Sequence, residues 1–382
     1  AFSEQFSNLE IGQSAGLVND CDELEDGVND ADCDNDEIEN FVGPITQTTF
    51  SDAGAEALSA TNFQSNEAQI AQGVGATNEC DEDGAGANLA LCTNEADNFI
   101  GELSQTSNAD DVADDFVQDN FIGIIGQGIS ASNNCDEVDD GDNGDGGVDQ
   151  FCGNTVGNTI ADGILITQQN GAAGTDVTDI SQSNHIPSIG QLLIAVNDCG
   201  QTGPGANLAN CGNNVFNTIN PITQTNDAFG SLFTDIFEDN DAAISQSIDV
   251  GNNCDGITFG LTGEDNIANC NNSVQNFFGS VSQTNLATGE FDALIDQDNN
   301  ADVAQNLIAD NNCDGTGTHG ADCSNDNAFN NIVSLAQTNT ADDELDASST
   351  QVNNAVVDQD MGLLNDCDEG DLGSTVDTFC QN

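Results

Sequence analysis

The feature that most constrains this 382-residue chain is a repeat: its cysteines recur as seven pairs, about 58 residues apart. Asn stands two residues before the first cysteine of every pair, and Gln stands eight residues before it. A fixed register of this kind is typical of a tandem array in which each repeat forms one structural unit. We therefore predict a single repeat array over 1–382, with modules near 1–58, 59–112, 113–176, 177–232, 233–290, 291–345 and a truncated last module, 346–382.

Each complete module contains a short segment with the alternation of a β-strand. Ile45-Thr-Gln-Thr48 recurs as Leu103-Ser-Gln-Thr106 and Val281-Ser-Gln-Thr284, so the aliphatic residue and Gln share one face and the hydroxyl residues share the other. The modules are too rich in Asn, Gly and Asp for helices, which need several turns of periodic apolar residues. The sequence thus predicts an all-β fold, a β-solenoid of seven tandem modules stapled by disulfides. It leaves open whether one module makes one wide coil or two.

The glutamine eight residues before the first cysteine is predicted to lie inside this solenoid. Gln is a poor core residue unless its amide is hydrogen-bonded, and identical side chains in stacked coils repeat about every 4.8 Å. An amide ladder would satisfy each Gln through its copies above and below. The predicted ladder consists of Gln13, Gln72, Gln127, Gln191, Gln246, Gln305 and Gln359. The alternative is a row of exposed glutamines that reflects composition alone.

The 14 cysteines indicate disulfides. Their number is even and no Cys-x-x-Cys occurs, which favours an oxidising, extracellular setting over zinc or redox chemistry. Pairing within each module would contribute about 3 kcal/mol per bridge. The predicted pairs are Cys21–Cys33, Cys80–Cys92, Cys135–Cys152, Cys199–Cys211, Cys254–Cys270, Cys313–Cys323 and Cys367–Cys380. Pairing between neighbouring modules is the alternative.

The charge of the chain excludes whole classes of partner. It has 68 Asp and Glu residues, no Lys and no Arg, and therefore a formal net charge of −68. Nucleic acids and anionic membranes both require a basic surface, so neither is expected as a partner. The chain begins at Ala1 without a basic segment, and we expect a secreted or cell-surface protein whose signal peptide has been removed.

The acidic loops between paired cysteines predict calcium as the one candidate cofactor. Hard cations bind carboxylate and carbonyl oxygens on glycine-rich turns. The richest loop supplies the candidate ligands Asp136, Asp139, Asp140, Asp142 and Asp145. The competing interpretation is a solvated acidic surface adapted to salt or low pH. The fourth loop, which begins Cys199-Gly-Gln-Thr-Gly, carries almost no acid and favours that second interpretation.

No arrangement of residues indicates catalysis. The two histidines, His185 and His319, do not recur between modules, and no nucleophile with a base and an orienting group can be identified. We expect no enzymatic activity, no catalytic or cofactor-binding residues and no small-molecule substrate.

A finer pattern lies inside the modules. Gln64-x-Asn66-x-Ala68-x-x-x-Gln72 recurs from Gln297 to Gln305 and from Gln351 to Gln359. A variant with Glu238 in place of the first Gln runs to Gln246. This pattern resembles the repeat of curlin-type fibre subunits, the curli amyloid family. The resemblance implies inward-facing Gln and Asn ladders and a β-solenoid able to stack into fibres. It covers about ten residues per module, and the longer modules with paired cysteines depart from the family.

Two functions remain after these exclusions. The first is a secreted structural protein, a subunit of an extracellular filament or surface layer that forms by head-to-tail stacking of copies of this chain. Solenoids that stay monomeric usually carry caps, and none is recognised here. The alternative is an acidic extracellular matrix protein that binds calcium or mineral. Ice binding is disfavoured, because hydroxyl pairs occur only once per module and not in every module. Because no basic side chain can neutralise the acids, we expect assembly to depend on cations, salt or low pH.

Overall fold

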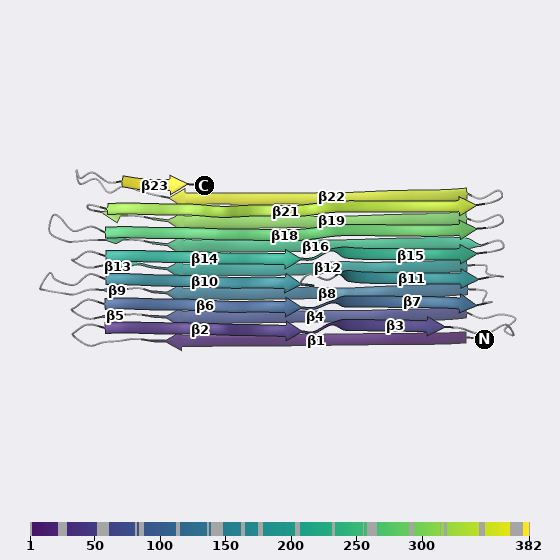
Figure 1. Cartoon of the computed structure of the whole chain (residues 1–382), viewed down its shortest axis with the longest axis horizontal. Helices are drawn as coiled ribbons and strands as arrows, with labels where there is room; N and C mark the ends of the chain where they lie inside the picture. The colour runs from purple at the N-terminus through teal and green to yellow at the C-terminus, as the bar shows by residue number, and fades with distance from the viewer. Residues whose placement is uncertain are drawn as a thin grey trace, which may run out of the picture.

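The structure, a computed structural model, describes residues 2–21, 29–51, 61–80, 82–83, 88–111, 115–135, 137–138, 148–161, 165–174, 179–202, 207–230, 234–254, 256–257, 266–289, 294–313, 315–316, 319–343, 348–366 and 377–381. These residues form two long, stacked layers of parallel strands (Figure 1). The predicted all-β solenoid of disulfide-stapled tandem modules is confirmed. No helix in the described part of the chain is long and apolar enough to cross a membrane.

We call the layer that takes one long strand from each module the front layer, because these strands come first in each module; the name does not refer to the view of Figure 1. The seven described strands of this layer are hydrogen-bonded in chain order. They are β1 (Phe2–Asp20), β4 (Thr61–Glu79), β8 (Asp115–Asn134), β12 (Asp179–Asp198), β16 (Asp235–Asn253), β19 (Leu294–Asn312) and β22 (Ser348–Asp366). Neighbouring strands pair in register, so that Gln72 lies beside Gln13 on one side and Gln127 on the other. Each module therefore makes one wide coil, which answers the question that the sequence leaves open.

The back layer returns the chain across each coil. Coils 1 to 4 use two strands each: β2 (Asn29–Val42) and β3 (Ile45–Ser51), β6 (Asn88–Ile100) and β7 (Leu103–Asp111), β10 (Val148–Ile160) and β11 (Ile166–Gly174), and β14 (Asn207–Ile219) and β15 (Ile222–Gly230). Coils 5 and 6 use one continuous strand each, β18 (Asn266–Gly289) and β21 (His319–Asp343). The described back-layer strand of coil 7 is β23 (Asp377–Gln381), which pairs with β21 only from Gly320 to Ser324.

A third, small sheet connects the cysteine-bounded loops. Its five described strands are two-residue segments, again parallel and in chain order: β5 (Glu82–Asp83), β9 (Glu137–Val138), β13 (Gln201–Thr202), β17 (Gly256–Ile257) and β20 (Gly315–Thr316). These two-residue segments of successive coils thus lie beside one another.

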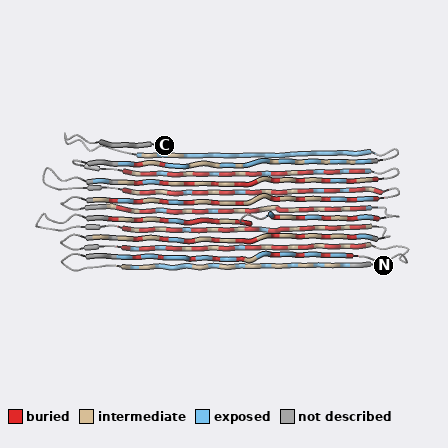
Figure 2. The backbone as a smooth tube through the Cα atoms, in the orientation of Figure 1, coloured by how far each residue is buried: buried red, intermediate tan, exposed pale blue. Residues whose placement is uncertain are grey.

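The core lies between the two layers and is built of columns. Buried and exposed residues alternate along nearly every inner strand, as expected for a sheet with one face in the core (Figure 2). Columns of aliphatic residues, such as Ile180, Ile236 and Ile295, run perpendicular to the strands. Columns of Gln and Asn lie between them. Because each coil repeats the same inward residues, the core continues unchanged from one coil to the next.

Candidate functional site

The predicted glutamine ladder runs the full height of the front layer. Gln72 Nε2 donates to Gln13 Oε1 over 2.8 Å, and each later coil repeats this bond to the coil before it, as far as Gln359 and Gln305 at 2.6 Å. The inner rungs are buried, and their amides also donate to backbone carbonyls of the back layer; Gln191 Nε2, for example, lies 3.1 Å from Asn158 O and 3.0 Å from Thr218 O.

Further amide columns extend beyond the predicted one. Front-layer Asn66, Asn120, Asn184, Asn240, Asn299 and Asn353 form a ladder with Nδ2···Oδ1 distances of 2.9 to 3.1 Å. A second column runs from Asn78 to Asn365 beside the disulfides. The back layer adds a column of Gln from Gln47 to Gln337 and one of Asn from Asn40 to Asn330. The front-layer column that begins at Asn66 is one that the resemblance to curlin repeats implies, whereas the back-layer columns are not predicted.

The amide columns have a direction. From Gln72 to Gln359, each Gln of the central ladder donates its N–H to the Gln of the preceding coil, so its Oε1 faces the following coil; Gln13 Nε2 donates to Phe41 O. The front-layer Asn columns have the opposite direction: Asn120 Nδ2 donates forward to Asn184 Oδ1. The N-terminal edge of the stack therefore carries the amide of Gln13 and the C-terminal edge carries the Oε1 of Gln359, each half of a bond that the inner coils complete.

The disulfides form a buried column beside the Asn ladder. Six lie within the described part of the chain, with Cα–Cα distances of 6.2 to 6.7 Å: Cys21–Cys33, Cys80–Cys92, Cys135–Cys152, Cys199–Cys211, Cys254–Cys270 and Cys313–Cys323. Sulfur atoms of adjacent coils approach one another, and those of Cys92, Cys135 and Cys152 lie within 4.8 Å. All of them are engaged in disulfides, a pattern typical of extracellular or secreted proteins.

Two of the predicted sites fall outside the described residues. All five candidate calcium ligands, Asp136, Asp139, Asp140, Asp142 and Asp145, lie there. So does Cys367 of the predicted Cys367–Cys380 pair, although the backbone at Cys380 pairs with Cys323 in β23.

Outward-facing acids also stack from coil to coil. Burial raises the pKa of Asp179, and the charges of Asp115 and Asp235 in the coils on either side raise it further. The pKa of Asp239 is raised by burial and then by Asp298 and Asp241. In the same region His185 Nδ1 lies 3.0 Å from Asp241 Oδ2 and its ring stacks on Phe121. The negative charges of adjacent coils therefore repel one another along the stack.

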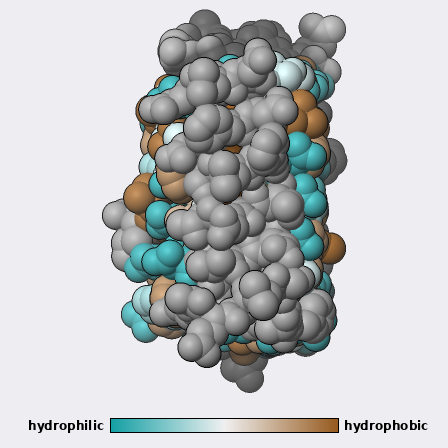
Figure 3. All heavy atoms as spheres, turned by 90° about the vertical axis from the view of Figure 1, so that its right-hand side faces the viewer, coloured by the Kyte–Doolittle hydropathy of each residue, from teal (hydrophilic) through white to brown (hydrophobic). Residues whose placement is uncertain are grey.

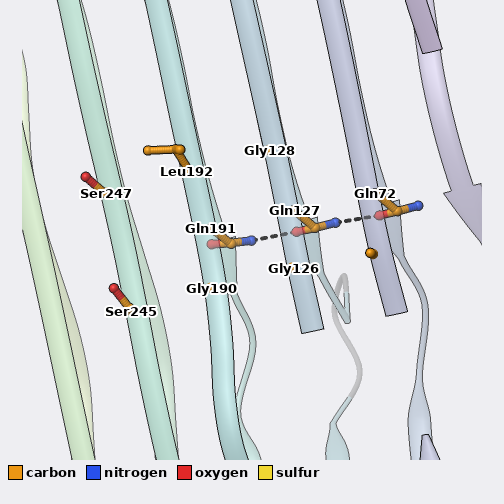
Figure 4. Close-up of a pocket in the computed structure, with 10 residues that line it drawn as sticks. Gln72, Gly126, Gln127, Gly128, Gly190, Gln191, Leu192, Ser245 and Ser247 are labelled. Carbon is orange, nitrogen blue, oxygen red and sulfur yellow. Dashed lines mark hydrogen bonds between the residues drawn. The ribbon is translucent and has the colours of Figure 1, made fainter. Parts of the chain in front are cut away.

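The front layer has a shallow groove above the central ladder. Its lining includes Gly126, Gly128, Gly190, Ser245 and Leu192 on the outward face, and the ladder residues Gln72, Gln127 and Gln191 lie on the strands beneath, with their amides turned towards the core (Figure 4). The ladder amides bond to one another and to the back layer, so they offer no free polar group to this groove. A side view from the end where the front strands begin shows hydrophilic and hydrophobic side chains mixed along both flanks of the stack (Figure 3).

Comparisons with models of known protein families, with curated proteins and with solved structures found no match for this chain. The resemblance to curlin repeats therefore remains a prediction from the spacing of Gln, Asn and Ala.

Proposed function

We propose that this protein is a structural subunit of an extracellular filament or surface layer in which copies stack head to tail. The observation that carries the proposal is the match between the two ends of the front layer. If β1 of one copy continues the stack beyond β22 of another, every inward column of the front layer meets side chains of its own kind.

The apolar columns illustrate this match. At the C-terminal edge, Met361 is 42% exposed and Val357 is 49% exposed, although the residues at these positions in the inner coils are buried. In the same register, the N-terminal edge presents Ala15 and Ile11 to them. Stacking would thus bury apolar surface that an isolated chain leaves in water, which is the main favourable contribution to association.

The hydrogen-bond polarity selects head-to-tail stacking over the meeting of like ends. Gln13 would donate to Gln359 Oε1, and Asn365 would donate to Asn19 Oδ1, as their counterparts do between inner coils. Two like ends would bring donors against donors or acceptors against acceptors. Heterologous contacts of this kind generate open filaments when the operation does not close.

The back layer of the last coil limits where two copies can touch. β21 is paired with β23 only over its first residues, so its edge from Asn325 to Asp343 lies one strand below β22. A partner that continues the front layer leaves room there for one more back-layer strand. We therefore propose that the front-layer strands β22 and β1 form the main contact between subunits.

A matched pair of variants on β22 tests the proposal. Met361→Lys places a charge in a column that becomes buried only on stacking, whereas Leu364→Lys places the same charge on the outward face, 56% exposed. We expect filaments of the unsubstituted chain and of Leu364→Lys in electron micrographs and sedimentation, and none of Met361→Lys. Equal assembly of both variants, or a monomer under all conditions of salt and pH, would reject the proposal.

The stacked acids favour a second candidate, an acidic matrix protein that takes up calcium. The column Asp115, Asp179 and Asp235 brings like charges together without any Lys or Arg to neutralise them. Calorimetric titration with calcium separates the two: saturable, stoichiometric uptake by a chain that stays monomeric supports the matrix function, and diffuse uptake that only promotes assembly supports the filament.

A further inference from the structure

Coil 5 interrupts the second glutamine column of the front layer with a carboxyl group. The column contains Gln64, Gln118, Gln182, Glu238, Gln297 and Gln351. Gln118 donates to Gln64, Gln182 to Gln118 and Gln351 to Gln297, all at 2.8 to 2.9 Å. Gln297 Nε2 donates to Glu238 Oε2 over 2.6 Å, so the carboxyl group accepts the bond that an amide oxygen accepts elsewhere.

The bond that an amide at 238 would donate is missing. Gln182 Oε1 and Glu238 Oε1 are both buried and both lack a hydrogen-bond partner. They are successive members of one column, and Gln182 Oε1 faces Glu238 because its amide nitrogen already bonds to Gln118 on the other side. Two oxygens at neighbouring rungs can bond only if one carries a proton.

The surroundings of Glu238 disfavour its ionised form. Its side chain is 2% exposed. Burial raises the pKa of Glu238 to about 8; the hydrogen bond from Gln297 opposes this rise, and the charge of Asp227 on β15 adds a smaller increase. The titratable groups nearest to it in register are Asp239 and Asp241 on its own strand, Asp296 and Asp298 on β19, and His185 on β12, which contacts Asp241. The more distant acids on these strands are Asp235, Asp249, Asp302, Asp310, Asp179 and Asp198, and β18 contributes none. The chain has no Lys or Arg that could pair with a carboxylate there.

We propose that Glu238 is a protonated rung: its carboxyl O–H donates to Gln182 Oε1, and loss of this proton breaks the column between β12 and β16. The junction of coils 4 and 5 is then a pH-sensitive joint in an otherwise continuous stack. This inference concerns the isolated chain and does not depend on filament formation.

The alternative is an ionised Glu238 that accepts hydrogen bonds from both neighbours. It requires the Gln182 amide to be reversed, with its nitrogen towards Glu238. The reversal would remove the 3.2 Å bond from Gln182 Nε2 to Asp227 O and would force Gln118 to reverse as well. It would also leave a charge in the core without a cation, which is strongly unfavourable.

The direction of the pH effect follows from proton binding. Below pH 4.5, the ordinary pKa of Glu, both folded and unfolded chains hold the proton. Between pH 4.5 and about 8 only the folded chain holds it, so stability falls as the pH rises through this window. Relative to a chain without this group, the unfolding equilibrium constant should increase about tenfold per pH unit there.

Glu238→Gln tests the proposal, because it installs the side chain that the neighbouring coils carry and is expected to fold. Infrared difference spectra at pH 7 should show one protonated carboxylic acid in the unsubstituted chain and none in Glu238→Gln. The matched control, Glu10→Gln, removes an exposed Glu of the same layer and should retain the protonated acid. Urea unfolding from pH 5 to 8 should show the steeper pH dependence in the unsubstituted chain and in Glu10→Gln, but not in Glu238→Gln.

Either of two results overturns the inference. One is the absence of a protonated carboxylic acid at pH 7, which would assign the reversed amides and an ionised Glu238. The other is an identical pH dependence of unfolding in the unsubstituted chain and in Glu238→Gln.

Discussion

At the residue scale, a buried Gln is stable here because its amide meets partners in two directions. The copies in adjacent coils complete the ladder, and carbonyls of the opposite layer accept the remaining N–H. A single Gln in an ordinary core rarely finds such partners, and buried amides are then costly. Stacking of similar coils therefore allows Gln, an otherwise poor core residue, to be buried with its amide hydrogen-bonded.

Gln191→Leu tests this dependence on neighbouring rungs. Leucine fills similar space but leaves Gln127 Oε1 without its donor, and it leaves one N–H of Gln246, whose Nε2 keeps its bond to Phe277 O, without an acceptor. With about 1–3 kcal/mol for each buried group left unsatisfied, we expect a loss of roughly 2–6 kcal/mol in the free energy of unfolding. Urea denaturation measures it, and Ser247→Ala on the outward face of the next coil is the control. A loss no larger than that of the control would show that the ladder contributes little.

The spacing from cysteine predicts the central ladder, and the resemblance to curlin repeats implies Gln and Asn ladders in the front layer. The back-layer Asn column from Asn40 to Asn330 is not predicted, for a physical reason. The Asn that follows the second cysteine stands six residues after it in most coils but seven in coils 1 and 6. In the structure Glu37 and Asn327, with φ of 54° and 55°, lie at these two places and absorb the extra residue. The Asn side chains remain in register although their spacing from cysteine differs. The spacing in the sequence therefore does not reveal that they form one column.

At the element scale, the back layer of coils 1 to 4 is interrupted, whereas each front-layer strand is continuous. Its strands in coils 1 and 4 are interrupted at Gly43-Pro44 and Asn220-Pro221, whereas β18 passes the same place without a break. A Cβ on Gly279 of β18 would lie 2.8 Å from Pro221 N. Glycine is therefore required here, because the backbone segments of adjacent coils approach closely.

Gly279→Ala should therefore destabilise the protein by about 1–3 kcal/mol through overpacking against Pro221. The control is Gly128→Ala on the outward face of β8, where an added Cβ meets nothing within 4 Å. This variant should be neutral or more stable by up to about 1 kcal/mol, because alanine restricts the unfolded chain. Comparison of the two urea midpoints decides the matter, and equal effects would contradict the close approach at Pro221.

The width of the coil is an element-scale property that the sequence leaves open. Back-layer segments such as Gln168-x-Asn170 and Gln224-x-Asn226 carry the same Gln-x-Asn motif as the front-layer strands. Each half of a module thus has the pattern of an independent coil. The structure pairs the two halves across one core, where Gln224 bonds to Asn184 O and Asn170 to Asn184 Oδ1.

At the scale of the whole molecule, seven coils of like charge are held together by apolar columns, amide ladders and disulfides. Burial raises the pKa of Asp179, Asp239 and Asp310, and acidic neighbours raise it further. The folded chain consequently binds protons more tightly than the unfolded chain. The stabilisation is complete below pH 3.8, the ordinary pKa of Asp, and is lost as the pH rises through the folded pKa values.

We therefore expect the melting temperature to rise as the pH falls from 8 towards 4, and to rise at neutral pH on addition of salt, which screens repulsion between exposed charges. Differential scanning calorimetry of Glu238→Gln measures the contribution of the stacked acids without that of Glu238. A melting temperature that falls on acidification, or that does not respond to salt, would show that repulsion between coils is unimportant.

The central claim is that copies continue one another's stack, and the axial rise of a filament measures it most directly. Seven front-layer strands at about 4.8 Å each predict a rise of about 34 Å per subunit, with strands perpendicular to the filament axis. Cryo-electron microscopy of assembled protein at low pH or high salt would determine this rise. Filaments with that rise and orientation would support head-to-tail stacking. Strands parallel to the filament axis, or a chain that remains monomeric under every condition, would contradict it.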